Sequence, residues 1–149
     1  MTDVVTCFLM YKKKILLLKR SNDVKTYKGH WAGISGYIEK NEKPFETAVK
    51  EIVEETGLKI TDFKLVKRGK PIKFKDNYKG KFFYWVIHPF IFSTTKKNIE
   101  IDWEHIDYKW ILPEEITNFQ TVPKLKEVFE STRKNEYQLL HDLTGDYKI

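Results

Sequence analysis

A helix with two different faces is the strongest local feature of this sequence, and it limits the folds that the chain can adopt. Proline is tolerated in the first turn of a helix and glycine is suited to end one, so Pro44 and Gly57 mark the two ends. Between them, apolar residues recur at helical spacing: Phe45, Ala48, Val49 and Ile52. We therefore predict a helix over residues 44–56 whose apolar side packs on the core of the protein.

Three glutamates share this predicted helix. Glu51, Glu54 and Glu55 stand at i, i+3 and i+4, so their side chains lie on one face, where like charges repel each other. A hard divalent cation such as Mg²⁺ prefers carboxylate oxygens and would relieve this repulsion. A solvated acidic face without a metal also satisfies the spacing. In either case we expect the carboxylates on the exposed side of the helix, away from the apolar residues.

The composition limits the class of protein. The chain has 149 residues, 41% of them hydrophobic and 15% aromatic, which suits a single folded domain over residues 1–149 and excludes a disordered chain. No apolar run approaches the roughly 20 residues that a membrane-spanning helix needs. The first ten residues include Asp3 and lack the basic start of a signal peptide. Since Cys7, the single cysteine, can form no internal disulfide, we expect a cytoplasmic protein with no membrane partner.

The formal charge of +6 comes from 27 basic and 21 acidic residues, and such an excess can attract polyanions. Nearly all the basic residues are lysines. The three arginines, Arg20, Arg68 and Arg133, are scattered, although arginine is the usual residue for bidentate recognition of phosphates and bases. A lysine-rich, solvated surface explains the charge, so we do not expect nucleic acid to be the main partner.

The order of predicted elements indicates an α+β fold with helices packed on a β-sheet. We predict a hairpin from residues 4–10 and 15–18, and a strand-rich segment at 31–38. Further strands are expected over 63–74, 82–92 and 108–112, with Pro89 marking a bulge or an edge. A helical turn at 113–116 and a second helix over 123–133, with Thr121 as its N-cap, complete the prediction.

The helix belongs to a longer motif. The segment from Gly36 to Leu58, GYIEKNEKPFETAVKEIVEETGL, resembles the Nudix box, Gly-x5-Glu-x7-Arg-Glu-U-x-Glu-Glu-x-Gly-U, where U is a bulky aliphatic residue. Six of the matched positions require one residue type, and at roughly 6% per type a chance match is on the order of one in ten million. The chain is identified as similar to the MutT-like Nudix hydrolases on these residues: Gly36, Glu42, Glu51, Ile52, Glu54, Glu55, Gly57 and Leu58.

This resemblance implies a Nudix fold, with a mixed β-sheet sandwiched between helices, and a pyrophosphohydrolase that cleaves a phosphoanhydride bond in a nucleotide-like substrate. It implies that the three helix glutamates bind Mg²⁺, with Mn²⁺ as an alternative, and that one of them activates water. By the same resemblance, Glu42 steadies the turn into the helix and Gly36 lets the loop fold tightly against it. Gly57 ends the helix.

Two positions depart from the family pattern. Lys50 stands where the family has an arginine that orients the catalytic glutamates, so the charge is kept but the planar, forked donor set is lost. Ser35 stands where many relatives have a glycine whose backbone carbonyl binds the metal, and serine can still supply that carbonyl. These departures keep an alternative open, in which a catalytically weak Nudix domain binds a nucleotide or RNA as a sensor.

Candidate residues outside the motif complete the predicted site. Glu104 is the candidate for an additional metal ligand or general base, and His105 for phosphate contact or proton transfer, although both also fit an ordinary solvated loop. Arg20 is a candidate for substrate phosphates. Trp31 and Tyr84 are candidates for base stacking, with the orientation of Tyr84 left open.

The stretch from Glu104 to Trp110 also resembles asymmetric diadenosine tetraphosphate hydrolases, but similar stretches occur in other Nudix branches. The substrate class therefore stays open among nucleoside triphosphates, oxidised triphosphates, dinucleoside polyphosphates and nucleotide sugars. The expected partner is a small nucleotide, and a homodimer is an open alternative to a monomer because many relatives dimerise.

Overall fold

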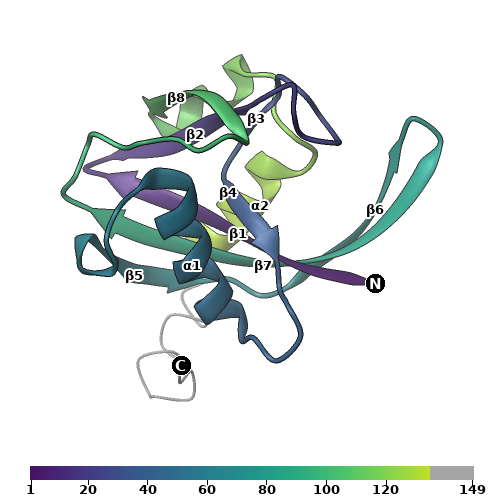
Figure 1. Cartoon of the computed structure of the whole chain (residues 1–149), viewed down its shortest axis with the longest axis horizontal. Helices are drawn as coiled ribbons and strands as arrows, with labels where there is room; N and C mark the ends of the chain where they lie inside the picture. The colour runs from purple at the N-terminus through teal and green to yellow at the C-terminus, as the bar shows by residue number, and fades with distance from the viewer. Residues whose placement is uncertain (135–149) are drawn as a thin grey trace.

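A computed structural model describes residues 1–134 of the protein and shows a mixed β-sheet covered by a helix on each face (Figure 1). The elements in chain order are β1 (Thr2–Tyr11), β2 (Lys14–Arg20), β3 (Trp31–Ala32), β4 (Ile34–Tyr37), α1 (Pro44–Thr56), the short 3-10 helix η1 (Ile60–Asp62), β5 (Phe63–Arg68), β6 (Ile72–Tyr78), β7 (Lys81–Thr94), β8 (His105–Ile111), the 3-10 helix η2 (Pro113–Asn118) and α2 (Leu125–Lys134).

The sheet is held together at its centre by the parallel pair of β1 and β7. These two strands stay in register from Thr2 opposite Trp85 to Tyr11 opposite Thr94. Strand β1 also pairs antiparallel with β2 and β4, while β7 pairs antiparallel with β5 and β6. The fold is therefore the predicted α+β arrangement with a mixed sheet.

Alternating side chains of the central strands fill two cores, one on each face of the sheet. On one face, Ala48 and Ile52 of α1 pack with a cluster that includes Val5 and Cys7 of β1. On the other face, α2 packs through Leu125, Val128 and Phe129 against the second cluster of buried residues. The odd-numbered residues of β1 thus pack toward α1 and the even-numbered ones toward α2, because successive side chains of a strand point to opposite faces of the sheet.

Helix α1 spans the predicted residues 44–56, and contacts at its two ends explain where it begins and ends. The Glu46 carboxylate accepts the Lys43 backbone N–H at 2.8 Å, which satisfies a donor at the N-terminus. Gly57 has φ of 72° and ψ of 3°, the left-handed conformation that terminates helices, and its N–H donates to the Val53 carbonyl at 3.0 Å. Both predicted helix ends are confirmed.

The prediction of one continuous strand over residues 63–74 was wrong. The segment forms two strands, β5 and β6, which pair with different parts of the long strand β7. Pro89 lies on β7 between these two partners, because β5 pairs as far as Phe90 and β6 begins opposite Ile87. Gly69 crosses this gap and donates its N–H to the Pro89 carbonyl at 3.0 Å. Proline has no backbone N–H to donate, so it is tolerated at this point between the ladders of β5 and β6.

The start of the second helix also differs from the prediction. Helix α2 begins at Leu125 and not at residue 123, so Thr121 is not its N-cap. Thr121 forms a parallel bridge with Trp31 instead, and the Val122 N–H donates to the Trp31 carbonyl at 2.9 Å. The segment before α2 is thus an extension of the sheet, a long-range pairing that local helix signals do not reveal.

The β6–β7 hairpin extends away from the sheet as a twisted arm (Figure 1). Its residues alternate between two faces, so Trp85 packs against the second core while Tyr84, one residue earlier, is 50% exposed. Among the described residues, no helix is long and apolar enough to cross a membrane. Residues 135–149 of the predicted domain lie outside the described part.

Replacing Gly57 tests the helix end. Gly57→Ala should lower the free energy of unfolding by about 1 kcal/mol, because alanine resists a left-handed φ and its Cβ would lie 3.1 Å from the Glu100 Cβ. Urea denaturation measures the change. Gly80 is the matched control, since it has φ of 83° but no heavy atom near an added Cβ. A loss at Gly57 no larger than that of Gly80→Ala would contradict the role of the contact.

Candidate active site

Strand β4 and helix α1 meet where Gly36 faces Glu51. A Cβ added at Gly36 would lie 2.6 Å from the Glu51 Oε1 atom, so no other residue fits at this position without moving the carboxylate. Gly36 is fixed in turn by β1, through its pairing with Val5. The sheet therefore positions the Glu51 carboxylate by direct contact with backbone. Ser35, the preceding residue, lies on the same short strand opposite Thr6.

The three helix glutamates lie in different environments. Glu54 is exposed and Glu51 is half-buried, whereas Glu55 is only 2% exposed. The prediction that all three stand on the exposed side of the helix was therefore wrong for Glu55. Its position follows from the helix itself, since Glu55 comes three residues after the fully buried Ile52 and thus turns toward the sheet.

Burial and mutual repulsion change the protonation of this cluster. Burial, together with the neighbouring Glu54 charge, raises the pKa of Glu51 to about 7, although a hydrogen bond with Glu55 and the Lys50 charge oppose the rise. Burial raises the pKa of Glu55 well above its usual range, and the charges of Glu51 and Glu104 add to this. The Glu55 Oε2 atom is buried and has no hydrogen-bond partner. Without a cation, Glu51 and Glu55 thus favour holding a proton.

His105 lies on the buried side of the carboxylate cluster, next to Glu55. Its side chain is 2% exposed, with Nε2 3.6 Å from Glu55 Oε1 and Nδ1 3.1 Å from Asp102 Oδ1. Burial lowers the pKa of His105, and the hydrogen bond to Asp102 counteracts part of this effect. The expectation that His105 contacts substrate phosphates is corrected accordingly, because both of its ring nitrogens face carboxylates inside the protein. The His105 ring contacts Glu55 from the interior of the protein.

Arg20 and Glu104 approach the same cluster from the end of β2 and the loop before β8. The Arg20 guanidinium donates to the Thr26 carbonyl at 2.9 Å, and the Ser21 N–H donates to the Glu104 carbonyl at 2.7 Å. Burial raises the pKa of Glu104, with a further contribution from Asp102. Burial lowers the pKa of Arg20, while the negative charges of Glu104 and Glu55 oppose this shift. The structure thus brings both predicted residues to the glutamates.

Lys50 is anchored to Glu42 by a salt bridge of 2.8 Å. The other Glu42 oxygen accepts the Glu39 N–H at 3.0 Å and the Thr47 hydroxyl at 2.9 Å. These bonds to Lys50 and Glu39 lower the pKa of Glu42, and the bond to Glu42 raises the pKa of Lys50. Lysine therefore ties the loop before α1 to the helix, directly before Glu51 in the sequence.

Two predicted stacking residues lie elsewhere. Trp31 is partly buried and packs against the core on the α2 side, with its ring centroid 5.3 Å from that of Phe119, so its contact with a substrate stays a prediction. Tyr84 lies on the outer face of the β6–β7 arm, where its ring is 5.6 Å from the Lys75 ammonium. The choice between Tyr84 and its neighbour is thereby decided, because Trp85 is the residue that turns inward.

Sequence reasoning missed several residues near Arg20. Asp102 holds His105, and the short Asp102–His105 spacing was visible in the sequence but lacked a family motif. Tyr37 and Tyr78 both contribute to the electrostatic environment of Arg20. Tyr37 lies beside Trp85, with ring centroids 6.2 Å apart, and Tyr78 lies 4.6 Å from Tyr27. No local signal unites these rings, since they come from four segments of the chain.

The donor set, a cluster of carboxylate oxygens, suits a hard divalent cation. Glu51 and Glu55 share a hydrogen bond, and the unpartnered Glu55 Oε2 needs a positive ligand or a proton. In residues 1–134, no group of three or more His, Cys, Asp or Glu side chains is placed to hold a metal ion as it stands. Carboxylates bind a cation in their deprotonated form, so a bound cation would lower the raised pKa values of Glu51 and Glu55.

The comparisons with known proteins identify the family of the chain. A family model described as the NUDIX domain matches residues 1–132. The chain therefore belongs to the Nudix family. It is a hydrolase acting on phosphoanhydride bonds of nucleoside triphosphates and their derivatives, in a family whose members generally use divalent metal ions.

Individual relatives are distant in sequence and similar in fold. The nucleoside triphosphatase NudI of Escherichia coli is 27% identical over 112 residues, which cover 70% of this chain and 77% of that protein. The E. coli dihydroneopterin triphosphate pyrophosphohydrolase superimposes with a TM-score of 0.72 at 15% identity, covering 93% of this chain and 95% of the other. The C. elegans Ap4A hydrolase gives a TM-score of 0.67 at 14% identity, covering 97% and 99%.

The raised pKa of Glu51 predicts how the stability of the metal-free protein changes with pH. Between its ordinary value of 4.5 and about 7, the folded state keeps a proton that the unfolded state loses, so stability should fall as the pH rises through this window. Glu51→Gln removes this effect. Urea denaturation in a chelator, at about pH 5 and about pH 8, should show the variant gaining stability relative to the wild type at the higher pH.

Glu114→Gln is the control for this measurement, because Glu114 is exposed and lies on η2, outside the site. It should follow the wild type at both pH values. A Glu51→Gln variant that also follows the wild type would show that Glu51 is ionised throughout the window, and the proton-holding description of the cluster would then be wrong.

Proposed function

We propose that the protein is a Mg²⁺-dependent pyrophosphohydrolase of nucleoside triphosphates or related nucleoside diphosphate derivatives. The observation that carries the proposal is the buried, unpartnered oxygen of Glu55 beside Glu51, in a cluster whose carboxylates have raised pKa values. A structural acidic face would leave its carboxylates in water, where they need no counter-charge. Glu51, Glu54 and Glu55 are the residues that would hold Mg²⁺, with the backbone carbonyl of Ser35 as a further ligand.

The neighbouring residues suit the hydrolysis of a phosphoanhydride. When bound, Mg²⁺ neutralises phosphate oxygens and makes water more acidic. Arg20 faces the carboxylates with a guanidinium that can bind phosphate oxygens in bidentate fashion. Glu104 has a raised pKa and remains partly exposed, so it can accept the proton of the attacking water. His105 and Asp102 keep Glu55 oriented from the buried side.

A small nucleotide is the substrate that the surroundings favour. Tyr37 and Tyr78 lie close enough to affect Arg20 electrostatically, and Trp85 lies beside Tyr37. Aromatic rings next to a phosphate-binding guanidinium suit a base attached to that phosphate. The name of the E. coli relative, nucleoside triphosphatase, agrees with this class. Among the open classes we therefore favour nucleoside triphosphates over dinucleoside polyphosphates and nucleotide sugars.

A substrate panel tests the proposal. We expect Mg²⁺-dependent release of pyrophosphate from one or more canonical or 8-oxo nucleoside triphosphates, and little turnover of diadenosine tetraphosphate, ADP-ribose or nucleotide sugars. Glu54→Gln should lower kcat by roughly 100-fold or more, because it removes a charged ligand from an exposed position that folding does not need. Product analysis by chromatography, with Mn²⁺ as a second metal, completes the measurement.

The control variant is Glu46→Gln, on the first turn of the same helix and also exposed. It should keep nearly full activity. Turnover by Glu54→Gln at the wild-type rate would refute the site assignment. A folded protein that is silent across the whole panel would refute the enzymatic proposal itself.

Lys50 gives a separate prediction. Lys50→Arg should preserve or raise kcat, because a guanidinium can keep the salt bridge to Glu42 and offers further donors. Lys50→Gln should lower kcat by roughly tenfold with little effect on stability, since exposed ion pairs contribute less than about 1 kcal/mol. Steady-state kinetics and thermal melting separate the two effects. A large loss in Lys50→Arg would mean that the loop before α1 is built around lysine.

A further inference from the structure

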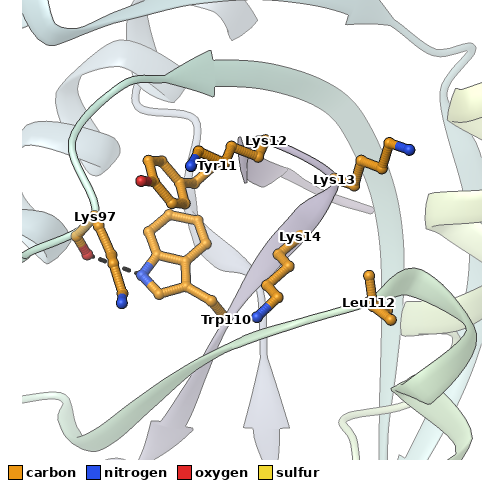
Figure 2. A pocket seen from close by; sticks show the side chains of 7 residues that line it. All are labelled: Tyr11, Lys12, Lys13, Lys14, Lys97, Trp110 and Leu112. Atoms are coloured by element: carbon orange, nitrogen blue, oxygen red, sulfur yellow. Dashed lines mark hydrogen bonds between the residues drawn. The ribbon is translucent and has the colours of Figure 1, made fainter.

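A basic pocket opens at the end of the sheet opposite the catalytic carboxylates. It has a volume of about 480 Å³, within the usual range for sites of small molecules. Figure 2 shows the side chains that line it: Tyr11, Lys12, Lys13, Lys14, Lys97, Trp110 and Leu112. None of them belongs to the Nudix motif or to the active site described above.

The pocket and the active site lie at the two ends of one strand pair. Strand β2 runs antiparallel to β8, with Arg20 opposite His105 at the active-site end and Ile15 opposite Ile111 at the pocket end. The six residue-to-residue steps from Lys14 to Arg20 span roughly 20 Å at about 3.3 Å per step. A ligand in this pocket would therefore be separate from a substrate at the carboxylates.

Two aromatic rings form a fixed wall of the pocket. The Trp110 indole Nε1–H donates to the Lys97 carbonyl at 2.8 Å, which holds the orientation of the ring (Figure 2). The Tyr11 ring lies against it, with centroids 5.7 Å apart and planes tilted by 55°. Both residues are only partly buried, so their rings remain accessible to a ligand.

The lysines around this wall have no acidic partner. Within residues 1–134, no carboxylate lies at ion-pair distance from any of the four pocket lysines, while other lysines, such as Lys50, do form salt bridges. The ammonium groups of Lys12, Lys14 and Lys97 lie around the two rings, whereas Lys13 points away (Figure 2). The Lys12 ammonium is 5.4 Å from the centroid of the Tyr11 ring. Three cations without a counter-charge favour an anionic ligand.

The turn that carries these lysines is built at a local cost. Residues 12 and 13 connect β1 to β2, and Tyr11 pairs with Lys14 across the turn. Lys12 has φ of 55°, a conformation that tight hairpin turns normally assign to glycine, asparagine or aspartate. The turn holds the backbones of Lys12 and Lys14 next to the two rings.

We propose that this pocket binds a nucleoside phosphate, with the phosphate held by Lys12, Lys14 and Lys97 and the base against Trp110 and Tyr11. Lysines beside exposed aromatic rings are the combination that proteins use to bind nucleotides without reading their sequence. The ligand is either a free nucleotide or the terminal nucleotide of a single strand. Since no carboxylate lines the pocket, binding needs no metal. The inference is independent of the proposed function.

Nuclear magnetic resonance in the presence of a chelator tests this site without engaging the metal-dependent one. The indole N–H signal of Trp110, assigned with Trp110→Phe, is followed during titration with adenosine 5′-monophosphate, adenosine, and a 5′-phosphorylated pentanucleotide. We expect a saturable shift with the monophosphate or the pentanucleotide, and none with adenosine. A response to the monophosphate assigns the site to free nucleotides, and a response to the pentanucleotide alone assigns it to single strands.

Matched variants separate the pocket from the general positive charge of the surface. Lys14→Gln combined with Lys97→Gln should weaken binding about fivefold, because each charged contact contributes roughly 0.5 kcal/mol. The control combines Lys73→Gln with Lys126→Gln, two exposed lysines on β6 and α2 that remove the same charge. The proposal is overturned if neither phosphorylated ligand shifts Trp110, if adenosine shifts it equally, or if the control pair weakens binding as much.

Discussion

The contact between Gly36 and Glu51 is the constraint on which the rest of the site depends. Strand β4 brings backbone against a carboxylate, and only glycine leaves room for it. The contact brings the edge of the sheet against α1, and further along the helix Glu55 lies buried beside His105, with one oxygen that has no partner among the described residues. Carboxylates crowded and buried in this way are unfavourable unless a proton or a cation compensates their charge. The protein thus combines a stable apolar half of one helix with an electrostatically strained half.

Local signals in the sequence were sufficient for α1 and its motif. Both ends of this helix are set by residues inside the segment, Pro44 and Gly57, so no tertiary information was needed. The face on which a side chain lies was harder to predict. The burial of Glu55 depends on how far α1 rotates on the sheet, and the exposure of Tyr84 depends on which face of β7 meets α2. These orientations are decided by contacts between distant segments.

The other differences have the same origin. Trp31 appeared suited to a ligand because it is aromatic and precedes the motif, but pairing with Thr121 brings it against the core beside Phe119. His105 appeared suited to catalysis because histidine titrates near neutral pH, yet Asp102 and Glu55 surround it inside the protein. Residue type indicates what a side chain can do, whereas the fold decides whether it meets solvent. Residue types considered without the fold therefore suggest more ligand-binding side chains than the fold exposes.

The parallel pair of β1 and β7 has a consequence for synthesis of the chain. The first strand, Thr2–Tyr11, completes its pairing only with residues 85–94. During translation, β1 and β2 can form a hairpin early, but the central strand lacks its neighbour until residues 85–94 have left the ribosome. Contacts so distant along the chain slow folding, because a large loop must close before they form. The nascent protein therefore leaves one edge of β1 unpaired during this interval, and such an edge can pair with another chain until β7 covers it.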